Sequence, residues 1–173
     1  DELRGEIRRA RKIVIHVGAG NAFRDWQSAN YIQLSKRLKA SGYSVFLIGH
    51  GQREFERGQA ISDAVDVINC VGKLTIAESL YLIQHSDCYF GVDSGPLHLA
   101  SLSSTPIVGI YGPNIPEISG PYRKEKIKIL QRPMDCRPCD QRICIYDIKD
   151  DKMKCMKEIS VDQVYEEIVK FSK

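Results

Sequence analysis

The sequence predicts an α/β fold, namely a Rossmann-like doubly wound parallel sheet with helices on both faces. Short apolar runs of strand length alternate with polar segments of helical spacing along most of the 173 residues. Several of these apolar runs end at a glycine-rich or polar turn, which is where such sheets carry phosphate-binding loops. The length suits one domain with a sizeable core, and no internal repeat interrupts the alternation.

The first apolar run, residues 12–17, predicts a buried strand that ends at a Gly-Ala-Gly turn, residues 18–20. This turn lacks the GxGxxG fingerprint of dinucleotide-binding proteins, but it occupies the position of a phosphate-binding loop after the first strand. Helical spacing then predicts a helix over residues 28–39, which ends through a glycine C-cap at Gly42.

Residues 44–48 predict the second strand, and the polar segment 53–62 predicts the helix that follows it. Glu54 and Glu56 lie early in that helix. An acidic residue after the second strand often binds the ribose hydroxyls of a nucleotide, although the same pattern is typical of ordinary solvated helix charges. Residues 65–71 predict a short third strand.

Two capping boxes predict helix starts. Thr75 is followed three residues later by Glu78, so a helix is expected over residues 76–85. A serine three residues before a glutamine marks the second box, at the start of an amphipathic closing helix over residues 160–171.

The central stretch of the chain carries the main candidate site. A buried strand is predicted at residues 88–92, and it breaks at the Asp-Ser-Gly-Pro sequence of residues 93–96, whose aspartate or serine can cap the helix that follows. The free N–H groups of a helix start suit a phosphate, Gly95 permits close approach to the backbone, and His98 lies on the first turn. The alternative is an ordinary helix start with a half-buried histidine.

A neighbouring strand favours the ligand site over that alternative. Residues 106–111 predict another buried strand, which ends in a second polar and glycine-rich turn at residues 112–114. The two strand ends should face one crevice, and open α/β sheets bind ligands outside the carboxyl ends of strands where the strand order reverses. After a loop over residues 114–121, a last strand is predicted at residues 126–130.

The six cysteines fall into two groups. Cys70 and Cys88 lie in apolar, strand-like contexts, so we expect them to be buried packing residues. The other four cluster in a cysteine-rich loop, defined here as residues 132–156: Cys136, Cys139, Cys144 and Cys155.

A Cys-x-x-Cys pair is a common half of a tetrahedral zinc site, but the two remaining cysteines of the loop are widely spaced. We therefore expect reduced, metal-free thiols that tie the loop to the domain, away from the ligand crevice. One alternative is a structural zinc held by the four thiols. Another is disulfides that form only after purification, since stable disulfides are not expected in the cytosol.

Composition excludes several classes of function. The net charge is only +3 and the basic residues are spread out, so the charge does not imply nucleic-acid binding. No apolar run is long enough to span a bilayer and no signal peptide opens the chain, which predicts a cytoplasmic protein, with peripheral contact at the inner membrane face as a variant. A start at Asp1, inside a basic amphipathic segment, is compatible with a piece of a longer protein.

Taken together, the motifs resemble glycosyltransferase family nine, the ADP-heptose:lipopolysaccharide heptosyltransferases. They are, in order, HVGAG with RDW, GKLT before a helix, DSGPLHLA, TPIVGIYGP with GPY, and CRPC with CMKEISVDQV. The resemblance covers nearly the whole chain. It implies a GT-B architecture, in which two Rossmann-like domains face each other across a cleft. Residues 1–173 would be the single donor-binding domain at the carboxyl end, without the amino-terminal acceptor domain.

The resemblance also implies residue roles. Glu54, with Glu56 as the alternative, would bind the ribose, and the backbone at Leu74 would contact the adenine. Arg24 stands where the family usually has a lysine, and it would stabilise the departing diphosphate together with Ser94 and His98. The full implied set of donor-binding residues is Gly18, Ala19, Gly20, Arg24, Glu54, Leu74, Asp93, Ser94, Gly95, Pro96 and His98.

The implied activity is inverting transfer of a sugar, heptose from ADP-heptose, to a lipopolysaccharide-type or other glycan acceptor, with no cofactor required. Because the family's catalytic base is an aspartate of the amino-terminal domain, the isolated chain is expected to be inactive. Two alternatives stay open: a nucleotide-sugar-binding module without catalysis, and another GT-B enzyme such as a nucleotide-sugar epimerase.

Overall fold

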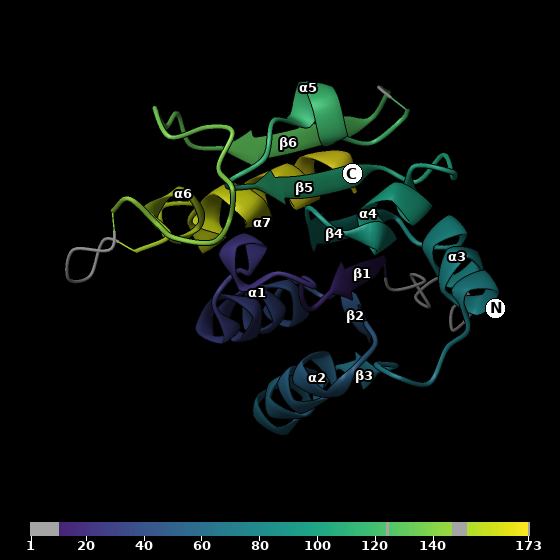
Figure 1. The fold of residues 1–173 in the computed structure, drawn as a ribbon. Coiled ribbons are helices and arrows are strands. Elements are labelled where there is room, and N and C mark those ends of the chain that lie inside the picture. The colour runs from purple at the N-terminus through teal and green to yellow at the C-terminus, as the bar shows by residue number, and fades with distance from the viewer. Residues whose placement is uncertain (1–10, 124, 147–151, 173) are drawn as a thin grey trace, which may run out of the picture.

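The structure is a computed structural model that describes residues 11–123, 125–146 and 152–172 (Figure 1). Within these residues, six parallel strands form one sheet in the order β3-β2-β1-β4-β5-β6, which confirms the predicted fold class. The strands are β1 (Lys12–His16), β2 (Ser44–Ile48), β3 (Ile68–Asn69), β4 (Cys88–Val92), β5 (Ile107–Tyr111) and β6 (Ile127–Gln131).

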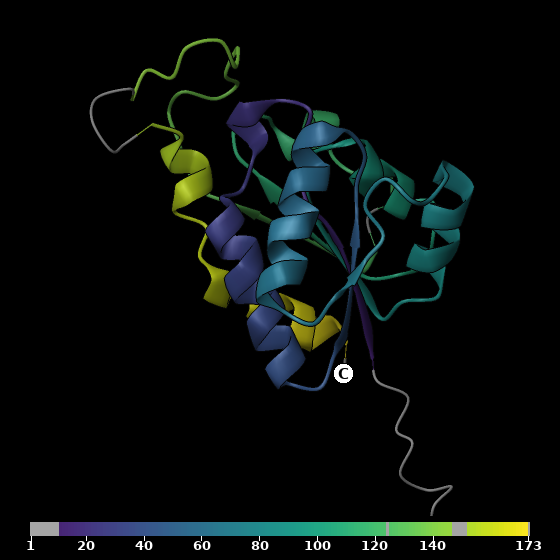
Figure 2. The ribbon, with the colours of Figure 1, turned by 90° about the horizontal axis from the view of Figure 1, so that it is seen from below.

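Helices cover both faces of the sheet, as Figure 2 shows with the sheet seen edge-on. One face carries α1 (Ser28–Ala40), α2 (Gln52–Ala64) and α7 (Val161–Phe171), and the other carries α3 (Ile76–Gln84) and α4 (Gly95–Ala100). Each face has its own apolar core, because the strands between them present buried side chains in both directions. Three short helical turns complete the described chain: η2 (Ala22–Arg24), α5 (Pro116–Ser119) and α6 (Lys154–Lys157).

The order of the strands reverses between β1 and β4, because the chain first builds the sheet outward to β3 and then returns to the other side of β1. β4 and β5 are neighbours, as expected. The sequence predicts the crevice at the ends of β4 and β5, but the strand order reverses on the other side of β4, between β4 and β1. The crevice that a ligand of this fold would use is therefore shared by the residues that follow β1 and β4.

Trp26 anchors the segment between β1 and α1 to the core. Its ring is fully buried and makes edge-to-face contacts with Tyr31 and Phe90, at centroid distances of 5.2 and 5.3 Å. Its indole N–H donates to the carbonyl of Ile159 at 3.0 Å, which connects the first loop of the domain to the chain just before α7. The polypeptide that leaves β1 is thus held close to the sheet.

Most predicted elements are confirmed within a residue or two of their ends. The strand at residues 44–48 has the predicted bounds, both capping boxes form, and Gly42 after α1 has a φ of +82°. The third strand is shorter than predicted, because Val65 is the C-cap residue of α2 and only Ile68–Asn69 pair with β2. The predicted loop at residues 114–121 contains the short helix α5.

Two smaller expectations need correction. Ser94 is the N-cap residue of α4, but its side chain makes no capping hydrogen bond, because the hydroxyl is turned inward to other partners. Cys88 is fully buried as expected, whereas Cys70 lies just beyond the end of β3 and is only half-buried. None of the helices within the described residues is both long and apolar enough to span a bilayer.

Candidate functional site

The turn that follows β4 lies beside the guanidinium of Arg24, which comes from the loop after β1. Nη1 of Arg24 donates to the carbonyl oxygen of Asp93 at 3.2 Å and lies 3.8 Å from the Asp93 carboxylate. The amide of Asn114, from the loop after β5, donates to the same carboxylate. Three loops at the carboxyl edge of the sheet therefore meet at Asp93, which is 3% exposed.

Arg24 keeps unused hydrogen-bonding capacity. Its Nε is buried and has no partner among the described residues, while about a quarter of the side chain, 26%, remains exposed. A guanidinium presents several donors in a planar fork that matches phosphate oxygens. Arg24 is thus a fixed positive charge at the edge of the crevice.

The two residues after Arg24 hold it in place. Asp25 accepts two hydrogen bonds from Arg57 of α2, and Trp26 is buried in the core. Arg57 also donates to the carbonyl of Val17 at 2.8 Å. The consecutive residues Arg-Asp-Trp thus have separate tasks, since the first faces the turn after β4 and the other two fix the loop.

Glu54, on the first turn of α2, reaches back over the ends of β1 and β2. Its Oε2 lies 3.1 Å from Nε2 of His16 and accepts a hydrogen bond of 2.8 Å from the backbone N–H of His50. A Cβ at Gly18 would lie 2.6 Å from Oε1, and one at Gly49 would lie 2.5 Å from Oε2. Both glycines are therefore needed to leave room for this carboxylate.

Electrostatics keep Glu54 ionised. Burial alone would raise the pKa of this carboxyl group, but the hydrogen bond and charge of His16, the backbone N–H of His50 and the charge of Arg57 outweigh it. The pKa of Glu54 is lowered as a result. A negative charge with fixed orientation therefore lies near the end of β1.

His16 links this carboxylate to the turn after β4. The residue is 2% exposed, and its Nδ1 lies 3.1 Å from Oγ of Ser94, which itself donates to the carbonyl of Val92 at 3.0 Å. The last residue of β1 therefore connects Glu54 on one side to Ser94 on the other.

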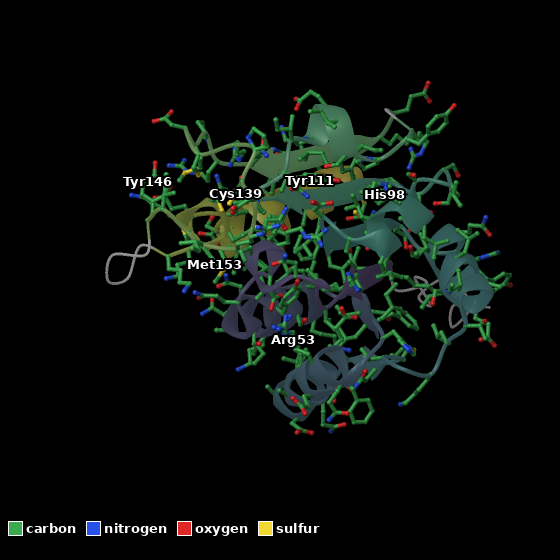
Figure 3. The ribbon with its side chains drawn as sticks, viewed as in Figure 1. Arg53, His98, Tyr111, Cys139, Tyr146 and Met153 are labelled. Carbon is green, nitrogen blue, oxygen red and sulfur yellow. The ribbon has the colours of Figure 1, made fainter. Side chains whose placement is uncertain are left out.

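The remaining predicted residues differ in their exposure. His98 is exposed on α4 (Figure 3). Added Cβ atoms at Gly20 and Gly95 would meet nothing within 4 Å, so both glycines face open space. Leu74 is half-buried against the core on the α3 face. Ala19 is buried and Pro96 is half-buried.

The cysteine-rich loop was expected away from the crevice, and this expectation is wrong. The N–H of Cys139 donates to the carbonyl of Pro113 at 3.2 Å, and the amide of Gln141 donates to Oδ1 of Asn114 at 2.7 Å. Asn114 in turn binds Asp93. The loop leaves β6 at the edge of the sheet and crosses back over the end of β5, which sequence order alone does not reveal.

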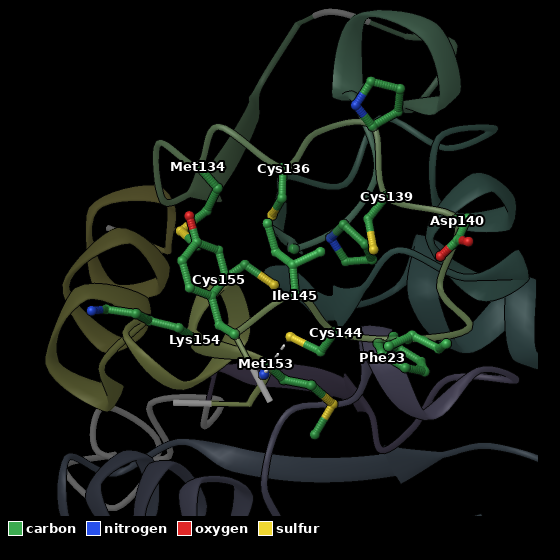
Figure 4. A pocket seen from close by; sticks show the side chains of 15 residues that line it. Phe23, Met134, Cys136, Cys139, Asp140, Cys144, Ile145, Met153, Lys154 and Cys155 are labelled. Carbon is green, nitrogen blue, oxygen red and sulfur yellow. Dashed lines mark hydrogen bonds between the residues drawn. The ribbon is translucent and has the colours of Figure 1, made fainter. Parts of the chain in front are cut away.

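The four thiols of this loop line one cavity of about 410 Å³ with Phe23 and Pro113 (Figure 4). All four are free, and no group of residues in the described parts of the chain is arranged to hold a metal ion. Burial is the main cause that raises the pKa of Cys155 to about 11. This thiol is therefore protonated at neutral pH.

Comparison with known proteins identifies the family. Residues 4–149 match the model of glycosyltransferase family 9 (heptosyltransferase). The chain belongs to this family. Lipooligosaccharide heptosyltransferase 2 of Campylobacter jejuni is 28% identical over 169 residues, which are 93% of this chain and 52% of that protein. The chain thus spans about half the length of the curated relatives it matches.

Solved structures of the family share the fold. ADP-heptose LPS heptosyltransferase II of Escherichia coli superposes with a TM-score of 0.78 at 22% identity, over 95% of this chain and 47% of that one. The E. coli heptosyltransferase WaaC, solved with ADP, gives a TM-score of 0.73 at 16% identity, over 94% of this chain and 44% of that one. These likenesses support the predicted GT-B half.

Sequence reasoning missed three features of the site. From the sequence, His16 is one residue within an apolar strand over residues 12–17, and nothing local indicates partners 38 and 78 residues away. The sequence predicts Gly18 as part of a phosphate-binding turn, whereas its missing Cβ makes room for Glu54. The sequence predicts Asn114 only as a turn residue. The signal that could have revealed the role of Gly18 is the acidic residue Glu54 on the first turn of α2, the helix after the second strand.

Proposed function

We propose that this chain is the donor-binding half of a family 9 glycosyltransferase and that it binds an ADP-sugar across the carboxyl ends of β1 and β4. The observation that carries the proposal is the meeting of Arg24, the Asp93 turn and the Glu54 carboxylate at the point where the strand order reverses. One end of this arrangement is positively charged and the other negatively charged, which suits a diphosphate joined to a ribose.

The diphosphate is proposed to lie against Arg24 and the residues from Asp93 to His98. About a quarter of the Arg24 side chain, 26%, is exposed, and Gly95 faces open space. A hydrogen bond to a charged group is worth about 1.5–3 kcal/mol, so Arg24 would contribute strongly to stabilising the leaving diphosphate. Gly18, Ala19 and Gly20 would complete this wall, with His98 toward the sugar.

The nucleoside is proposed to extend toward β2 and β3. Glu54 would accept hydrogen bonds from the ribose hydroxyls through the oxygen that does not bind His16 or His50. Glu56 is exposed and is already bound by Gln52, which makes it the weaker candidate. The backbone at Leu74 would meet the adenine, because the residues after β3 adjoin the end of β2 through a bond from Gly72 to Gly49.

The reaction of the whole protein is proposed to be inverting transfer of heptose to a lipopolysaccharide-type acceptor. The names of the relatives support this proposal, since they are heptosyltransferases of lipopolysaccharide or lipooligosaccharide. Because the chain spans about half the length of those relatives, we propose that the acceptor site and the general base belong to residues outside it.

Calorimetric titration of the chain with ADP-, UDP- and GDP-sugars tests the proposal. ADP-sugars should bind most tightly, and Arg24→Ala and His98→Ala should each weaken binding, by roughly tenfold for Arg24, without unfolding the domain. Lys36→Ala is the matched control, because Lys36 is an exposed cation on α1. If both site variants bind an ADP-sugar as tightly as the parent, the diphosphate site is wrong. Equal binding of all three nucleotide-sugars contradicts the adenine assignment.

A further inference from the structure

His16 is a buried polar residue whose two ring nitrogens both have a partner. Nε2 lies 3.1 Å from Glu54 and Nδ1 lies 3.1 Å from Ser94, and the side chain is 3% exposed. A single imidazole therefore contacts α2 on one side and the turn before α4 on the other. Its place as the last residue of β1, the strand at which the sheet order reverses, makes both contacts possible.

The contact with Glu54 decides which carboxylate oxygen remains available. Oε2 is taken by His16 and by the N–H of His50, whereas Oε1 has no hydrogen-bond partner among the described residues. The backbones of Gly18 and Gly49 lie close against the carboxylate and restrict its rotation. The cradle thus fixes one oxygen inward and leaves the other free, with 12% of the side chain exposed.

The contact between His16 and Ser94 leaves the Ser94 hydroxyl with protein partners only. A serine hydroxyl has one proton, and here both of its partners, Val92 O and His16 Nδ1, belong to the protein. The side chain is therefore held inward, and the backbone of the turn is what faces the crevice.

We propose that His16 is a positioning residue that holds the Glu54 carboxylate in place for the ribose through Nε2, while Nδ1 independently fixes Ser94 in the turn below the diphosphate. This inference rests on the proposed function. His16 would control ribose recognition without touching the ligand. Its two ring nitrogens would have separate roles.

Two variants with an amide side chain, His16→Gln and His16→Asn, distinguish the contributions of Nε2 and Nδ1. The amide nitrogen of His16→Gln lies where Nε2 lies and keeps the bond to Glu54, while that of His16→Asn lies where Nδ1 lies and keeps only the bond to Ser94. Each variant retains one of the two hydrogen bonds, so each is the control for the other in stability. The readout is the ratio of the ADP and 2′-deoxy-ADP dissociation constants for the same protein sample, which cancels any loss of folded protein.

The parent should prefer ADP over 2′-deoxy-ADP by about tenfold, since a hydrogen bond to a charged group is lost with the 2′-hydroxyl. His16→Gln should keep this preference and His16→Asn should lose most of it. Equal selectivity of the two variants, whether high or low, overturns the inference and leaves nucleotide binding intact. A parent that binds ADP without preference also overturns it, through the ribose assignment. A parent that binds no ADP overturns the proposed function itself.

A measurement on the parent covers the case in which either variant fails to fold. The ring nitrogen resonances of His16 can be followed by NMR in the ¹⁵N-labelled chain during titration. Saturation with ADP should shift the Nε2 resonance of His16 more than saturation with 2′-deoxy-ADP does. Equal shifts with the two nucleotides overturn the inference.

Discussion

Arg57 binds the carboxylate of Asp25 through two parallel hydrogen bonds, of 2.7 and 2.6 Å, from its two terminal nitrogens. Its Nε donates to Ser28 at 2.9 Å, and one terminal nitrogen also reaches the carbonyl of Val17. A single side chain of α2 thus holds both ends of the loop between β1 and α1. The loop carries Arg24, so the position of that cation depends on Arg57.

We predict that Arg57→Lys destabilises the chain by roughly 1–3 kcal/mol, because an ammonium cannot reproduce the planar two-point contact with Asp25. Urea denaturation followed by circular dichroism measures the change. Arg53→Lys is the control, since Arg53 is exposed on the same helix, and it should change stability by no more than about 0.5 kcal/mol. A similar effect of both substitutions would contradict the role given to Arg57.

We predict that Gly18→Ala weakens ADP binding and lowers stability, because the new Cβ would lie 2.5 Å from Cγ of Glu54 and force the carboxylate out of its cradle. The expected loss of stability is about 1–3 kcal/mol. Gly20→Ala is the matched control, since its Cβ would meet nothing within 4 Å. Thermal unfolding and ADP titration of both variants test the claim, and unchanged ADP affinity in Gly18→Ala would count against it.

We predict that Glu54 contributes to stability only where it is ionised. Its pKa in the folded chain is lowered from 4.5, so the unfolded chain takes up the proton first as the pH falls. The contribution is full above about pH 4.5 and disappears as the pH falls through the lowered folded pKa. The stability difference between the parent and Glu54→Gln should therefore shrink on acidification. Glu56→Gln, at an exposed position, should follow the parent throughout.

We predict that the cysteine-rich loop is metal-free when the chain is purified without chelator. Only two of its four cysteines form a close pair in the sequence, whereas the second half of a structural zinc site is usually a close pair as well. Elemental analysis should find well under one zinc per chain, and thiol titration under denaturing conditions should count all six cysteines as reduced. About one zinc per chain with sulfur ligands near ~2.3 Å would favour the structural zinc instead.

The fold could be predicted because its signals are local. The strand at residues 44–48 is a buried apolar run between turn residues, and the Thr75 and Ser160 boxes mark helix starts through contacts only three residues apart. The third strand was predicted too long because the apolar residues after Val65 suit a strand, whereas only two residues of this edge strand find partners on β2.

The candidate site was predicted only in part because its contacts are not local. The pattern after β4 indicated Asp93 and Ser94, but the partners of Ser94 depend on the spatial order of the strands, which brings β1 beside β4. The cysteine-rich loop was misplaced for the same reason. Its position follows from where the chain crosses the sheet after β6, and neither composition nor spacing reports that path.

The contacts of Asn114 limit which segments of this domain can be exchanged with those of another family member. Its side chain donates to Asp93 and accepts from Gln141, and its carbonyl accepts from Gln131. A chimera that imports the cysteine-rich loop from another family member changes one of these three partners and leaves the others behind. Grafts that move residues 114–156 as one block keep Asn114 with Gln131 and Gln141, and only the contact with Asp93 then joins graft and host. Such blocks are the natural unit for exchanging parts among these enzymes.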